Sequence, residues 1–170
     1  MFLRHRSAAL VGCMLLLAPF AARSARGPST PEERKQALDI IQRWEADPLN
    51  PSLTQEREWV LNWIIQIPDV HVTVCVFFDK LPKGDKKDAA NIVLAQMFSQ
   101  AAFVLQNPDR KDNRLAESMA GVEGALTVYE AQLKTNAKDR QPFLDDLIQK
   151  RDAGALPQWV KERAVAACHP

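Results

Sequence analysis

Apolar residues recur three and four positions apart in every long segment of this 170-residue chain, and this spacing restricts the chain to helices. The stretch from residue 113 to 135 is the clearest case, because one stripe contains most of its large apolar residues: Leu115, Met119, Val122, Leu126, Tyr129 and Leu133. Similar stripes follow in residues 31–47, 53–67 and 89–106, and after Pro142 and Pro157. The pattern predicts an all-α protein, a compact bundle of about six helices.

Local signals refine this prediction at helix ends and interiors. Thr30 precedes Pro31 and stands three residues before Glu33, a spacing typical of a capping box at a helix start. Gly121 and Gly124 lie inside a predicted helix, where each costs about 1 kcal/mol relative to alanine. We expect them to allow a neighbouring helix to approach closely. The helices over 53–67 and 89–106 carry the widest apolar faces and are expected to be central.

Residues 70–76 are the one stretch whose pattern is ambiguous. Valines alternate there with other residues, which is a strand signal. No second run of this kind occurs in the chain, so a strand would leave its backbone groups unpaired. Val70, Val74 and Phe77 also fit a helical spacing, which favours a buried helix. A short strand over residues 70–76 is the alternative.

The start of the chain has the layout of a secretory signal peptide. Two arginines precede residues 8–22, which are apolar and uncharged, and small residues then place cleavage after Ser24. Cleavage would leave a flexible leader over residues 25–29 and a single helical domain over residues 30–170, exported to the periplasm or the extracellular space. Lipidation of Cys13 and an uncleaved anchor are the alternatives, and the apolar stretch is shorter than the roughly 20 residues that span a bilayer.

The charge balance excludes some classes of partner. The chain has 22 basic and 21 acidic residues, a net charge of +1. Loss of residues 1–24 removes three arginines, and the 19 basic and 21 acidic residues that are left give −2. Neither net charge favours nucleic acid as a binding partner. Residues 89–108 carry no charge, but their amide side chains argue against a membrane span after signal cleavage.

The cysteines and histidines beyond residue 24 fall in two places, His71 with Cys75 and Cys168 with His169. In an oxidising compartment, two cysteines predict one disulfide, here between Cys75 and Cys168. The alternatives are unpaired thiols and a zinc or copper site formed by the four residues, with His71 and Cys75 on one face of a helix.

Trp59 and Trp63 lie one helical turn apart, so they could form an aromatic surface for a sugar or a partner helix, although core packing is the favoured role. We find no phosphate-binding loop, no local nucleophile motif and no signal for a cofactor. The sequence therefore favours an exported, non-catalytic domain that binds an unidentified protein partner or serves the cell envelope. A metal-binding or redox protein and an enzyme whose site is assembled from distant residues are the alternatives. The oligomeric state is not predicted.

Overall fold

All regular structure in the described part of the chain is helical, which confirms the all-α prediction. The computed structural model describes residues 26–73, 75–81 and 87–168. Within these ranges it has six α-helices, two short 3-10 helices and no strand. The elements are α1 (Pro31–Ala46), η1 (Pro51–Leu53), α2 (Thr54–Gln66), α3 (Lys87–Gln106), α4 (Arg114–Thr135), η2 (Ala137–Asp139), α5 (Pro142–Asp152) and α6 (Leu156–Ala167). The predicted signal peptide, its cleavage after Ser24 and the alternative site at Cys13 lie outside the described residues.

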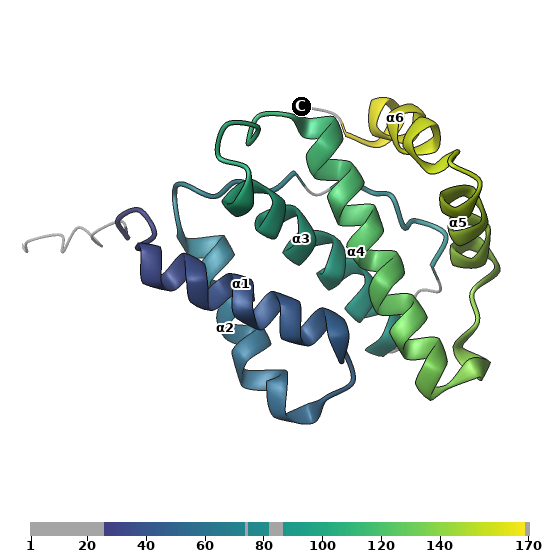
Figure 1. Cartoon of the computed structure of the whole chain (residues 1–170), viewed down its shortest axis with the longest axis horizontal. Helices are drawn as coiled ribbons and strands as arrows, with labels where there is room; N and C mark the ends of the chain where they lie inside the picture. Colours follow the sequence, from purple (N-terminus) through teal and green to yellow (C-terminus); the bar gives the residue numbers. More distant parts are fainter. Residues whose placement is uncertain (1–25, 74, 82–86, 169–170) are drawn as a thin grey trace, which may run out of the picture.

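The centre of the bundle is an antiparallel pair, α3 and α4, joined by residues 107–113 (Figure 1). α1 packs against both helices of the pair and α2 packs on α1, while α5 and α6 lie on the other side of α4. The expectation that α3 is central is confirmed. The same expectation for α2 is wrong, because α2 lies at the edge of the bundle and Ile65 is 70% exposed.

Two glycines explain how closely α3 and α4 approach. A Cβ atom on Gly124 would lie 2.5 Å from the Cβ atom of Ser99 and closer still to its Oγ atom. A Cβ atom on Gly121 would lie 2.8 Å from Cγ of Gln100. Only a residue without a side chain fits at Gly124, which confirms the predicted role of these glycines in helix packing.

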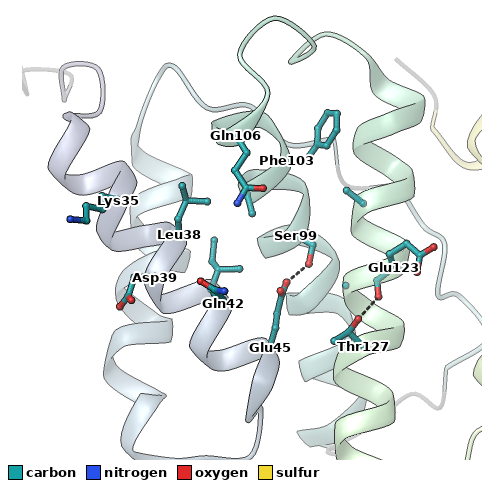
Figure 2. A pocket seen from close by; sticks show the side chains of 14 residues that line it. Lys35, Leu38, Asp39, Gln42, Glu45, Ser99, Phe103, Gln106, Glu123 and Thr127 are labelled. Atoms are coloured by element: carbon teal, nitrogen blue, oxygen red, sulfur yellow. Dashed lines mark hydrogen bonds between the residues drawn. The ribbon is translucent and has the colours of Figure 1, made fainter.

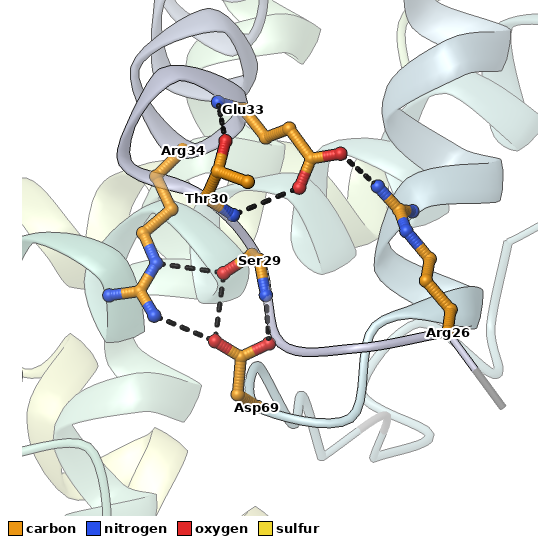
Figure 3. A network of polar contacts seen from close by, with 6 residues as sticks. All are labelled: Arg26, Ser29, Thr30, Glu33, Arg34 and Asp69. Atoms are coloured by element: carbon orange, nitrogen blue, oxygen red, sulfur yellow. Dashed lines mark hydrogen bonds and ion pairs between the residues drawn. The ribbon is translucent and has the colours of Figure 1, made fainter.

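The start of α1 is fixed by a capping box and by a contact with the turn after α2. Thr30 accepts a hydrogen bond from the backbone N–H of Glu33, and the Glu33 carboxylate accepts one from the Thr30 N–H, as predicted. Ser29 donates from both its backbone N–H and its hydroxyl to the carboxylate of Asp69, each at 2.8 Å (Figure 3). Arg34 contacts the same carboxylate at 2.7 Å. The last residue of the predicted leader is therefore bound to the bundle.

The described residues of the 70–76 segment are extended and irregular, so both the helix and the strand predicted there are wrong. Long side chains, not a second strand, pair its backbone. Gln96 donates to the carbonyl of Cys75 at 3.0 Å, and Gln100 donates to the carbonyl of Thr73 at 2.9 Å. The buried carboxylate of Glu117 accepts a hydrogen bond from the Thr73 N–H at 2.7 Å. Side chains of α3 and α4 thus pair the backbone of Thr73 and the carbonyl of Cys75 without a neighbouring strand.

α6 packs against the residues that follow this segment. The rings of Phe77 and Trp159 lie 6.1 Å apart, and Arg163 forms an ion pair with Asp79 at 2.6 Å. Val160 is fully buried on the same helix. These contacts place the end of α6 beside the extended segment, near Cys75.

Residues Ala89–Gln106 of α3 form the one stretch, among the described residues, that is long and apolar enough to cross a membrane. Length and composition alone are weak grounds for a span, because buried core helices meet the same criterion. α3 packs against α1, α2 and α4, and Ala95, Phe98 and Ala101 are fully buried in the protein core. Its apolar face is therefore used within the bundle.

Candidate functional site

A groove of about 590 Å³ lies between α1 and α4, with α3 as its floor (Figure 2). Its α1 wall contains Lys35, Leu38, Asp39, Ile41, Gln42 and Glu45; its floor contains Ser99, Ala102, Phe103 and Gln106; its α4 wall contains Ala120, Glu123, Gly124 and Thr127. Small-molecule sites in proteins commonly have volumes of about 300–1,000 Å³. The groove is therefore large enough for a small organic ligand.

The carboxyl group of Glu45 is the distinctive polar group of this groove. It accepts a hydrogen bond from the hydroxyl of Ser99 on α3, and the two side chains point toward each other across the floor (Figure 2). Burial raises the pKa of Glu45, and the hydrogen bond from Ser99 offsets this rise in part. Glu45 forms no ion pair with any described residue, so its negative charge is not neutralised by the protein there.

The cations closest to Glu45 along α1 either form ion pairs with other carboxylates or lie far from it. Arg43, two residues before Glu45, pairs with Asp39 at 2.9 Å and with Glu56 at 2.5 Å. Lys35 lines the opposite end of the groove, ten residues earlier on α1, which corresponds to about 15 Å along the helix axis. The Glu45 end of the groove is therefore acidic, and the Lys35 end is basic.

Glu123 lines the groove, but its carboxylate does not face the floor. Its backbone carbonyl accepts a hydrogen bond from the Thr127 hydroxyl at 3.0 Å, while its carboxylate points away from α3 (Figure 2). Burial raises the pKa of Glu123, and the charge of Arg151 on α5 opposes this rise. Glu45 is consequently the carboxyl group that faces the floor.

The sequence did not predict this site. Its residues come from three helices, and Ser99 and Glu45 are 54 positions apart. The one available signal was Gly124, whose close approach to α3 was predicted and which lines the groove. The polar residues of α1 resembled an ordinary solvated face.

Of the four predicted metal or disulfide residues, the structure brings two together. Cys75 and Cys168 form a disulfide with a Cα–Cα distance of 4.9 Å, as predicted. His71 is exposed on the extended segment, so the helical face that would have paired it with Cys75 does not exist, and His169 lies outside the described residues. Among the described residues, no group of three or more His, Cys, Asp or Glu side chains is arranged to hold a metal ion.

The predicted aromatic surface is largely internal. Trp59 and Trp63 stack with ring centroids 5.9 Å apart and planes at 15°. Trp63 is only 2% exposed and Trp59 is half-buried. The pair therefore packs within the protein, the role that the sequence favoured, and leaves one partly exposed ring at the surface.

Comparisons with protein-family models, curated proteins and solved structures find no match to this chain. The groove and the chemistry of the residues that line it are therefore the basis for inferring its function.

Proposed function

We propose that the protein is an exported, non-catalytic binding domain whose groove takes a small organic cation with an apolar body. The observation that carries the proposal is the Glu45 carboxyl group, held by Ser99 in the groove and without a cationic partner among the described residues. Glu45 is partly buried, and a charge withdrawn from water is costly unless it is paired. An ammonium group beside Glu45 would supply the missing charge.

The rest of the groove fits the other parts of such a ligand. Leu38, Ile41, Ala102 and Phe103 give apolar surface beside the carboxyl group. Gln42 and Thr127 lie nearby and offer uncharged hydrogen-bonding groups. Lys35 at the far end would repel a second positive charge, which favours a monocation.

Two observations support export. The first 24 residues have the composition of a signal peptide. The disulfide between Cys75 and Cys168 is of a kind that persists mainly in oxidising compartments. A binding domain outside the cytoplasm would meet its ligand in the periplasm or the extracellular space.

Calorimetric titration with hexylamine, which is protonated at neutral pH, tests the ligand class. We expect hexylamine to bind, with 1-hexanol and hexanoate binding at least tenfold more weakly. Glu45→Gln should weaken hexylamine binding about tenfold or more, because hydrogen bonds to charged groups contribute about 1.5–3 kcal/mol. The same substitution should leave the weak binding of 1-hexanol unchanged.

Glu58→Gln is the matched control, since Glu58 is an exposed carboxylate on α2 outside the groove. It should bind hexylamine as the parent does. Equal affinities of hexylamine and 1-hexanol for the parent, or equal losses in both variants, would show that the groove does not select a cation.

A further inference from the structure

The geometry points to a second binding site, independent of the groove, that takes a small amphipathic carboxylate beside the disulfide. The site is a pocket of about 260 Å³ between the start of α4, the last turns of α6 and the extended segment. Its lining contains Thr73, Cys75, Arg114, Leu115, Ser118, Lys161, Ala164, Val165 and Cys168.

Apolar groups form most of the pocket wall. The disulfide, the side chain of Ala164 and the exposed side chains of Leu115 and Val165 all line it. Val165 is 78% exposed and Leu115 is 43% exposed, so both present hydrocarbon surface to solvent. Filling the pocket with an alkyl chain would remove this surface from water, which is favourable in proportion to the area buried.

Two exposed cations lie at the rim and select the charge of the ligand. Arg114 begins α4 and Lys161 lies on α6, on opposite sides of the pocket. Neither forms an ion pair with a described residue. Glu117, the nearest acidic neighbour of Arg114 on α4, is buried and accepts a hydrogen bond from Thr73. Arg114 interacts electrostatically with Glu117 without a direct ion pair. A carboxylate at the rim would therefore meet Lys161 and would share the charge of Arg114 with Glu117.

A buried hydroxyl gives a further polar contact. Ser118 is 2% exposed and lines the pocket, and its hydroxyl can donate a hydrogen bond to an anion. A carboxylate oxygen of the ligand, or a water molecule held by it, would accept from this hydroxyl.

The volume limits the size of the ligand. A water molecule takes about 30 Å³ in the liquid, so a pocket of about 260 Å³ has room for roughly nine non-hydrogen atoms. Octanoate fits this limit when its carboxylate lies at the rim. The inferred ligand is thus a free carboxylic acid with a short hydrocarbon body.

Octanoate is the probe for the experiment, with 1-octanol and octylamine as matched uncharged and cationic compounds. The oxidised full-length protein is titrated with each compound while backbone NMR signals are followed. We expect octanoate to shift the signals of Leu115, Ala164 and Val165. 1-Octanol should bind there at least threefold more weakly, and octylamine should not bind there.

Charge removal at the rim provides variants that leave the fold intact, because Arg114 and Lys161 are exposed. Arg114→Gln and Lys161→Gln should each weaken octanoate binding two- to fivefold, the range expected for exposed ion pairs, without changing 1-octanol binding. Lys138→Gln removes an exposed cation in η2 and is the control without effect.

A pocket-filling variant tests the location. Ala164→Met should weaken octanoate and 1-octanol alike by about tenfold while hexylamine binding to the groove is retained. Absence of shifts with octanoate up to millimolar concentration would overturn the inference. Shifts with anionic lipid vesicles but not with octanoate would also overturn it, since the surface would then recognise a membrane.

Discussion

Asp69 is a single side chain on which the start of α1 depends. Its carboxylate accepts two hydrogen bonds from Ser29 and contacts Arg34, so it joins the residue before the N-cap of α1 to the turn after α2 (Figure 3). Burial alone would raise the pKa of Asp69, but the hydrogen bonds from Ser29 and the interaction with Arg34 outweigh this effect and lower it.

We predict that Asp69→Asn lowers the free energy of unfolding by about 1 kcal/mol at pH 7, discounted for the exposure of Arg34. The pKa of Asp69 is lower in the folded protein than the ordinary value of 3.8, so its contribution is present above that value. The contribution is lost as the pH falls through the lowered pKa. Urea unfolding of both proteins from pH 7 downward would measure this convergence.

Asp109→Asn is the control for this experiment, because Asp109 is exposed on the loop between α3 and α4. It should unfold as the parent does at every pH. A loss of stability in Asp69→Asn that persists unchanged in strong acid would assign the effect to packing rather than to charge.

The contribution of Glu45 to stability depends on pH in the opposite direction to that of Asp69. Burial raises its pKa, so the folded protein holds this proton more tightly than the unfolded chain does. Its contribution to stability is greatest below the ordinary value of 4.5 and declines as the pH rises through the raised pKa. In the absence of a ligand, ionised Glu45 therefore lowers the free energy of unfolding at neutral pH.

We predict that Glu45→Gln lessens the decline in stability between pH 4.5 and neutrality and stabilises the protein without ligand at pH 7. Part of the decline should persist, since burial also raises the pKa of Glu117 and of Glu123. Thermal unfolding across this pH range is the measurement. An unchanged pH profile in Glu45→Gln would mean that Glu45 is as well solvated in the folded protein as in the unfolded chain.

At the scale of the elements, the contact between α3 and α4 depends on the absence of a side chain at Gly124. An alanine there gains about 1 kcal/mol in helix propensity. However, its Cβ atom would lie 2.5 Å from that of Ser99, so the helices would have to move apart. The steric cost of overpacking a core is typically about 1–3 kcal/mol.

We predict that Gly124→Ala lowers the free energy of unfolding by about 1–2 kcal/mol, the steric cost less the gain in propensity. Ser99→Gly introduced into this variant removes the opposing Cβ atom and should recover part of the loss. Chemical denaturation of the parent, the two single variants and the double variant gives the coupling between the positions. Strictly additive effects would contradict a direct contact.

The sequence predicts those elements well whose interactions are local, and it predicts poorly those that depend on distant residues. The start of α1 was predictable because Thr30, Pro31 and Glu33 act within one turn. The extended segment was not, because its backbone partners are Gln96, Gln100 and Glu117 on two other helices. The groove depends in the same way on contacts between distant residues, and a pattern of local spacing carries no information about them.

At the scale of the whole molecule, the disulfide between Cys75 and Cys168 links residues 93 positions apart. Closing a loop of this length restricts the unfolded chain and stabilises the fold by up to about 4–5 kcal/mol. This is a large share of the total stability of a typical domain, about 5–15 kcal/mol.

We predict that Cys168→Ser lowers the free energy of unfolding by up to about 4 kcal/mol and that reductant produces the same loss in the parent. Reductant should not destabilise Cys168→Ser further, which makes that variant its own control. Melting curves with and without reductant, and with and without a chelator, are the measurement. The metal site considered from sequence predicts the reverse, a loss with chelator and little change with reductant.

Export is a separate prediction about the whole chain. The basic start, the uncharged apolar stretch and the small residues after it predict cleavage after Ser24 in a secreting host. Mass spectrometry of the purified protein should give the mass of residues 25–170. A protein that retains Met1, or one that begins with an acylated Cys13, would contradict this prediction.

The disulfide also divides the chain into a covalent ring and a part outside it. The ring encloses α3, α4, α5 and α6, whereas α1 and α2 precede Cys75 and are not enclosed. The floor and one wall of the groove thus belong to the ring, and the other wall, α1, does not. The disulfide therefore does not hold α1 against α3. A ligand bound in the groove, as proposed above, would join the part of the chain that the disulfide constrains to the part that it leaves free.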